Sequence, residues 1–189
     1  MLTERIIGAL TFRKGVYAEV ERDVEFTNTA WVIVAVTGFL VQLGKLPTYG
    51  FKNFGSWLIA AIIGVLLAVG GFALAALVVS WAGKQFFKAE TNFGEMVRVL
   101  GLAYVWNAVG VVGLLGFIPF LVCILSPIIF IAALAGLVAW VFAAKEALDL
   151  DWVPTIVTLA IGWVVNLVIS TVIGGAIMTV LGVGAIITG

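Results

Sequence analysis

The chain has 189 residues, of which 63% are apolar and 11% are charged, and its ten basic and ten acidic residues cancel. Soluble domains are about 45–50% apolar and about 25% charged, so this composition excludes a water-soluble globular domain and predicts an integral membrane protein. Because the net charge is zero, there is no general electrostatic attraction for nucleic acid, and we expect no nucleic-acid partner.

Residues 1–26 predict a short amphipathic segment ahead of the membrane spans. Apolar residues recur there at helical spacing in two groups, Leu2, Ile6 and Leu10, and then Val16, Val20 and Val24. Gly15 is expected to divide the segment into two short helices. The segment either lies among lipid headgroups, with Arg13 and Lys14 at lipid phosphates, or offers its face to a cytoplasmic partner.

Residues 27–189 predict a transmembrane domain of five apolar helices. A hydrocarbon core of about 30 Å needs about 20 apolar residues in helical form. We expect the spans at 29–44, 56–83, 97–117, 118–144 and 153–173. Pro127 is expected to kink the fourth span. Gly174 and Gly175 are expected to break or kink the chain before a terminal tail, and one long, tilted helix is the alternative. The fold class is therefore an all-α, polytopic membrane helical bundle.

The basic residues predict the orientation of these spans. With the N-terminus in the cytoplasm, eight basic residues lie inside and two, Lys45 and Lys52, lie outside. Loops on the cytoplasmic side carry the excess of lysine and arginine in most membrane proteins. We therefore expect a multi-pass protein of the cell membrane, with a cytoplasmic N-terminus and an external C-terminus.

The predicted spans lack the residues that intramembrane chemistry needs. The chain has no histidine, its three aspartates lie in predicted loops, and no charged residue lies near the middle of a span. Nucleophile–histidine pairs and histidine metal sites are thereby excluded, and proton relays normally keep charged residues at mid-span. We expect no catalytic site, no metal site and no cofactor, and hence no enzyme.

A few polar and small residues remain inside the spans. Gln42, Asn107 and Asn166 either bond between helices or line a polar path, and we expect Asn107 and Asn166 each to bond to another helix. Small residues also recur about one turn apart in "GVVGLLG" and "AALAG". They allow close approach of helix backbones, either within one chain or between two copies in a homo-oligomer.

Charged residues lead directly into the third span in "TNFGEMVRVLG". Glu95 and Arg98 are three apart and can pair on one helix face. Arg98 is expected to reach lipid phosphate and fix the depth of the span, while Glu95 stays in the water layer. The alternative is a contact with the turn that holds Lys145, Asp149 and Asp151, or with a protein partner shared by both segments at the cytoplasmic face.

Three segments carry a family resemblance: "RIIGALTFRKGVYAEVERD" before the first span, "NFGEMVRVLGLAYV" entering the third, and "FAAKEALDLDW" after the proline-bearing fourth. With them the chain resembles the Yip-domain family (Ypt/Rab-interacting proteins) of five-span membrane proteins, and its short N-terminal segment resembles a prokaryotic type. For eukaryotic members the resemblance implies Rab GTPase binding in vesicle traffic. The Asp-Leu-Tyr-Gly-Pro stretch that accompanies that role is missing here, so Rab binding is not carried over.

What the resemblance implies for this chain is a non-enzymatic scaffold or partner-binding protein that organises the membrane. The lipid bilayer is then its first partner. The alternative function is a passive channel or small-solute transporter, lined by Gln42, Asn107 and Asn166.

Overall fold

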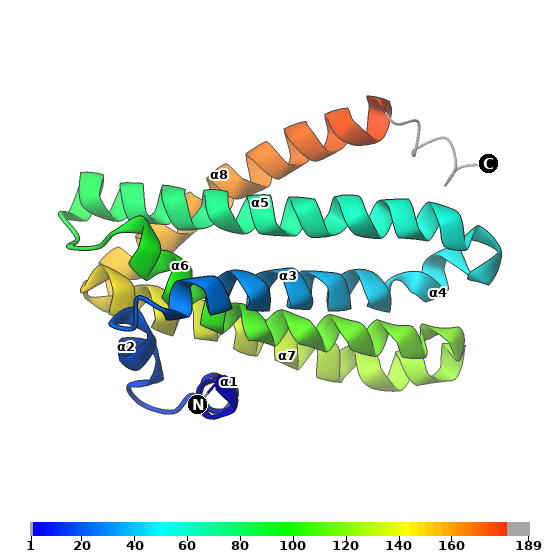
Figure 1. Ribbon diagram of the computed structural model, residues 1–189, viewed down its shortest axis with the longest axis horizontal. Helices are drawn as coiled ribbons and strands as arrows, with labels where there is room; N and C mark the ends of the chain where they lie inside the picture. Colours follow the sequence, from blue (N-terminus) through cyan, green and yellow to red (C-terminus); the bar gives the residue numbers. More distant parts are fainter. Residues whose placement is uncertain (1, 181–189) are drawn as a thin grey trace.

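The computed structural model describes residues 2–180, all of its regular elements are helices, and Figure 1 shows them gathered into an elongated bundle. Two short helices, α1 (Leu2–Leu10) and α2 (Val16–Glu21), precede the spans. Gly15 lies between them with a φ of 81°, a left-handed conformation that glycine adopts without a steric penalty. The expected division of the N-terminal segment at Gly15 is confirmed.

Five helical stretches are long and apolar enough to cross a membrane, which confirms the all-α, five-span fold class. They are built from α3 (Phe26–Gly44) with α4 (Leu46–Tyr49), the short 3₁₀ helix η1 (Phe51–Asn53) with α5 (Phe54–Phe87), α6 (Phe93–Ala103) with the 3₁₀ helix η2 (Tyr104–Phe117), α7 (Pro119–Leu148) and α8 (Trp152–Val180).

Figure 1 shows the two ends of the bundle, and the sequence shows that they differ in composition. We call the end with α1, α2, the α5–α6 connection and the α7–α8 turn the charged end, and the end with α4, η1 and the η2–α7 connection the opposite end. The charged end holds much of the buried core, including the fully buried Val16, Val20, Met96, Leu100 and Leu148. These side chains come from α2, α6 and α7, so the N-terminal segment is packed into the fold.

The third span changes from an α-helix to a 3₁₀ helix at Tyr104. Runs of 3₁₀ helix are usually only three or four residues long, whereas η2 has 14. Because a 3₁₀ helix has three residues per turn, Gly110, Gly113 and Gly116 fall on one face. A methyl group added at Gly113 would lie 2.5 Å from the carbonyl oxygen of Gly44 in α3. These glycines therefore allow backbone contact between two spans of the same chain.

The fifth span is one long helix, which is the alternative that the sequence left open. α8 runs from Trp152 to Val180 and continues through Gly174 and Gly175, so the chain does not break at these glycines. Backbone groups in hydrocarbon have no water to bond to, and continuing the helix satisfies them even at glycine. The terminal tail after residue 180 lies outside the described residues.

Candidate functional site

The N-terminal segment is docked onto the charged end of the bundle. Val16 and Val20 of α2 are fully buried in the same core as Met96 of α6. An ion pair of 2.6 Å joins Arg5 of α1 to Asp23, which follows α2. The apolar face of α2 is thus covered by the chain itself, and the charged residues of the segment are exposed or only partly buried.

Arg98 holds the end of α2 in place. Its side chain is buried, with the residue only 6% exposed. Nε and Nη2 of Arg98 donate to the carbonyl oxygen of Glu21 at 2.9 and 2.5 Å, and Nη1 donates to Oγ1 of Thr27 at 3.4 Å. Glu21 is the last residue of α2, where the helix dipole favours a cation. This internal bonding replaces the contact with lipid phosphate that the sequence predicted for Arg98.

Glu95 does not pair with Arg98 as the spacing suggested; it starts the helix that carries Arg98. The side-chain oxygen of Asn92 accepts a hydrogen bond of 2.9 Å from the backbone N–H of Glu95. The Glu95 carboxylate accepts one of 2.8 Å from the backbone N–H of Asn92. This reciprocal arrangement is a capping box, which satisfies two backbone donors at the start of α6. The sequence carries the signal for this cap, because Asn and Glu three residues apart precede the apolar run.

Four carboxylates lie near one another at the charged end. The pKa of Glu21 is raised to about 7, first by burial and then by the negative charges of Asp149, Glu95 and Glu146, against a smaller lowering by Arg22. We call Glu21, Glu95, Glu146 and Asp149 the acidic group. Glu95 and the α7–α8 turn therefore both act on the charge of Glu21, while a contact between Glu95 and the turn stays a prediction.

The other predicted residues of the α7–α8 turn have local structural roles. Lys145 lies over the ring of Trp152, with Nζ 5.3 Å from the ring centre. Asp149 ends α7 in a left-handed conformation, with a φ of 49°. The carbonyl oxygen of Asp151 accepts hydrogen bonds from the amide and the hydroxyl of Thr155 at 3.1 and 2.9 Å, which begins α8. Whether Lys145, Asp149 and Asp151 also contact a partner stays a prediction.

The three polar residues predicted inside the spans have different surroundings. Nδ2 of Asn107 donates to the carbonyl oxygen of Tyr104 at 3.2 Å, three residues earlier in the same 3₁₀ helix, so the expected bond to another helix is wrong for Asn107. The side-chain amide of Gln42 lies directly against Gly64 of α5, which is a contact between helices. The side chain of Asn166 lies outside the described residues.

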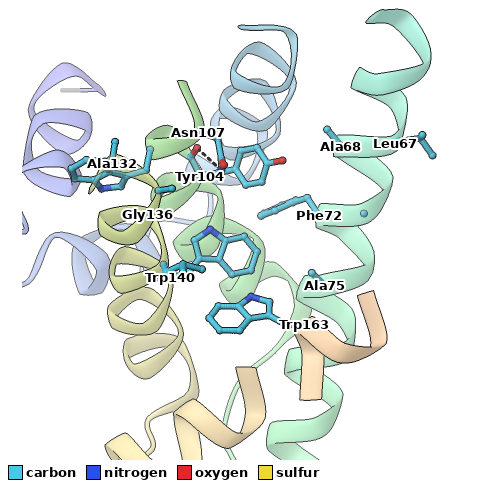
Figure 2. A pocket seen from close by; sticks show the side chains of 14 residues that line it. Leu67, Ala68, Phe72, Ala75, Tyr104, Asn107, Ala132, Gly136, Trp140 and Trp163 are labelled. Carbon is cyan, nitrogen blue, oxygen red and sulfur yellow. Dashed lines mark hydrogen bonds between the residues drawn. The ribbon is translucent and has the colours of Figure 1, made fainter. Parts of the chain in front are cut away.

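A cavity of about 330 Å³ lies among α5, η2, α7 and α8. Figure 2 shows that aromatic side chains, Phe72, Tyr104, Trp140 and Trp163, make up much of its wall, with Asn107 at one side. Gln42 is not among the lining residues of this cavity. Gln42 and Asn107 are therefore not joined in this cavity.

Two tryptophans form hydrogen bonds between segments that the sequence analysis did not predict. Nε1 of Trp57 donates to the carbonyl oxygen of Gln42 at 2.9 Å, which joins α5 to α3. Nε1 of Trp106 donates to the carbonyl oxygen of Ala9 at 3.3 Å, which joins η2 to α1. A buried indole N–H usually finds an acceptor, but the sequence does not show which carbonyl lies opposite it.

The comparisons with known proteins agree with this architecture. The model of the Yip1 domain matches residues 7–174, which include the last part of α1, the whole of α2 and the five spans as far as Gly174. No curated protein and no solved structure matches the chain. Since the match covers most of the sequence and the structure has the five spans that the resemblance implied, the chain belongs to the Yip1 domain family of membrane proteins.

Proposed function

We propose that this chain is a non-enzymatic protein of the cell membrane that binds a protein partner at the cytoplasmic face and organises the membrane around it. The observation that carries the proposal is the acidic group, which gathers charges from α2, α6 and α7 over a docked N-terminal segment. Glu146 and Asp149 are exposed there. A partner with a basic surface fits this arrangement, because complementary charge guides and orients association.

The proposed orientation of the chain in the membrane rests on its basic residues. The charged end carries Arg5, Arg13, Lys14, Arg22, Lys84, Lys88, Arg98 and Lys145, whereas Lys45 and Lys52 lie at the opposite end. This bias supports a cytoplasmic charged end and a C-terminus on the outer side.

The residues predicted for partner binding take separate roles in this proposal. Arg98 and Glu95 position α2 and α6, since their polar atoms are engaged within the chain. Lys145, Asp149 and Asp151 then provide contacts around the partner. Self-association through the same face is a further form of the proposal, in which the partner is a second copy.

A passive channel or small-solute transporter is the second candidate, and the cavity that contains Asn107 is the observation that favours it. The two candidates differ in flux. Vesicles containing the purified chain should be no leakier to small entrapped solutes than vesicles without it if the chain is a scaffold, whereas selective flux would support the channel.

Site-specific photo-crosslinking in native membranes tests partner binding directly. A photoreactive amino acid replaces the exposed Arg22 beside the acidic group or, as a matched control, the exposed Lys52 at the opposite end. We expect a protein adduct from position 22 only, and its yield should fall in the Glu146→Gln/Asp149→Asn variant. Equal adducts from both positions, or a yield insensitive to the two neutral substitutions, would contradict the proposal.

A further inference from the structure

A second pocket, separate from the aromatic cavity, lies where the turn after α1 meets the α7–α8 turn. Its volume is about 270 Å³, and its wall includes Arg13, Lys14, Tyr17, Phe142, Lys145 and Trp152. The pocket therefore combines residues that are far apart in the sequence, and it exists only because the N-terminal segment is docked.

The charge of the pocket is positive. Arg13, Lys14 and Lys145 line it, and Glu146 is the one carboxylate among the described residues of its wall. Arg13 also pairs with Glu19 at 2.7 Å outside the pocket, so part of its charge is balanced. Lys14 and Lys145 add two further cations, and the balance favours an anionic ligand.

Tyr17 lines the pocket and carries an unused hydrogen-bond donor. The residue is only 7% exposed, and its hydroxyl is buried without a hydrogen-bond partner. A buried hydroxyl without a partner is unfavourable, because it has lost water and gained nothing in return. Burial also raises the pKa of Tyr17, so the phenol stays protonated and able to donate near neutral pH.

The aromatic wall places the pocket at the membrane surface. Phe142 and Trp152 are in edge-to-face contact, with ring centres 5.2 Å apart, and remain 42% and 46% exposed. They lie near the ends of two membrane spans, Cys123–Leu148 and Trp152–Ile169. Tryptophan is enriched at this level of a bilayer, where hydrocarbon meets the lipid headgroups. An acyl chain can therefore run along the aromatic wall while a headgroup enters the pocket.

We propose that this pocket binds the headgroup of an anionic phospholipid, with the Tyr17 hydroxyl donating to the phosphate and Lys14 and Lys145 as counter-charges. Pockets for drug-sized ligands commonly measure about 300–1,000 Å³. At about 270 Å³ this pocket is slightly smaller, which suits a headgroup whose acyl chains stay outside. A choline headgroup fits less well, because its cation would meet the lysines. The pocket shares Lys145 and Glu146 with the face proposed to bind a protein partner, but the test below measures lipid binding alone.

The test uses the full chain in neutral detergent, with lipid binding followed by native mass spectrometry. The probes are dioctanoyl phosphatidylglycerol, dioctanoyl phosphatidylcholine and glycerol phosphate. We expect phosphatidylglycerol to bind more tightly than phosphatidylcholine. The Tyr17→Phe variant should lose about tenfold in affinity for it, since one hydrogen bond to a charged group is removed. The Lys14→Gln/Lys145→Gln variant should lose at least as much.

Matched controls at the opposite end are Tyr49→Phe and Lys52→Gln, which should bind phosphatidylglycerol as the wild type does. Thermal unfolding separates binding from folding: without lipid, Tyr17→Phe should be as stable as wild type or more so, because it removes an unpartnered hydroxyl. With phosphatidylglycerol, wild type should become the more stable of the two. Three outcomes would each overturn the proposal. The first is that phosphatidylcholine binds as tightly as phosphatidylglycerol does, and the second is that Tyr17→Phe keeps full affinity. The third is displacement of the lipid by glycerol phosphate, which would assign the pocket to a soluble phosphate.

Discussion

At the charged end of the bundle, side chains from α2, α6 and α7 are completely buried, whereas the first half of α7, which leads from the opposite end, leaves its apolar side chains exposed. Phe120 and Phe130 are 73% and 64% exposed, respectively. Lipid is as apolar as these side chains, so exposing them to it costs little. Toward water, by contrast, the chain has to bury its apolar surface, and the docked N-terminal segment provides that cover.

The helices at the two ends are also held together by different kinds of contact. The charged end uses long-range bonds from side chains, above all from Arg98 to the carbonyl oxygen of Glu21. The other half of the bundle uses close backbone contact, in which Gly44 of α3 meets Gly110 and Gly113 of η2. Hydrogen bonds from side chains position the docked segment, whereas close packing of glycine backbones positions the spans. Substitutions at each end should therefore have distinct effects.

The largest effect is expected from Gly44→Leu. A side chain at this position would overlap the carbonyl oxygen of Gly110, and backbone cannot move aside as a side chain can. Forcing extra atoms into a packed contact costs about 1–3 kcal/mol, and we expect a loss in free energy of unfolding of about 3 kcal/mol. Thermal unfolding followed by circular dichroism measures it. Gly70→Leu in α5 is the control, since a Cβ there meets nothing within 4 Å. Equal unfolding midpoints for the two variants would contradict the backbone-contact explanation.

Arg98→Met should have a smaller and more local effect. It leaves the carbonyl oxygen of Glu21 without its donors, which costs about 2 kcal/mol of docking free energy. We expect faster hydrogen exchange in Val16–Glu21, with little change in α5. Arg98→Lys should give an intermediate result, because a lysine lacks the forked donors of arginine.

The control for Arg98 is Lys84→Met, which removes one exposed positive charge at the same end. Exchange in α2 should be unchanged in that variant. If both substitutions loosened α2 equally, net charge and not the bond to Glu21 would hold the segment.

The smallest effect concerns pH. The pKa of Glu21 is raised from 4.5 to about 7 in the folded chain. Between these values the docked state binds more protons than the open state, so docking should weaken as the pH rises through this window and level off above it. Hydrogen exchange of α2, corrected for intrinsic rates, at pH 5 and pH 8 measures the change. Glu21→Gln should remove this dependence, whereas Glu25→Gln should retain it; a dependence that persists in Glu21→Gln would assign the titration to another group.

Sequence reasoning was most successful where a single segment decides its own structure. The five spans and the turn at Gly15 follow from local hydropathy and glycine conformation, and both are present. It failed at Asn107, because apolar periodicity does not reveal that the span changes to a 3₁₀ helix whose carbonyl at Tyr104 lies within reach. It failed at Arg98 because the acceptor, Glu21, lies 77 residues earlier.

The sequence by itself determined that this chain spans a membrane five times and begins with two short amphipathic helices. Water-free hydrocarbon forces every long apolar segment into a helix, so length and composition are sufficient for that conclusion. Only the tertiary structure decided that the glycines of η2 contact α3 of the same chain, that Arg98 holds α2, and that four carboxylates meet near one turn. Those outcomes depend on which distant groups become neighbours, and packing between helices determines this.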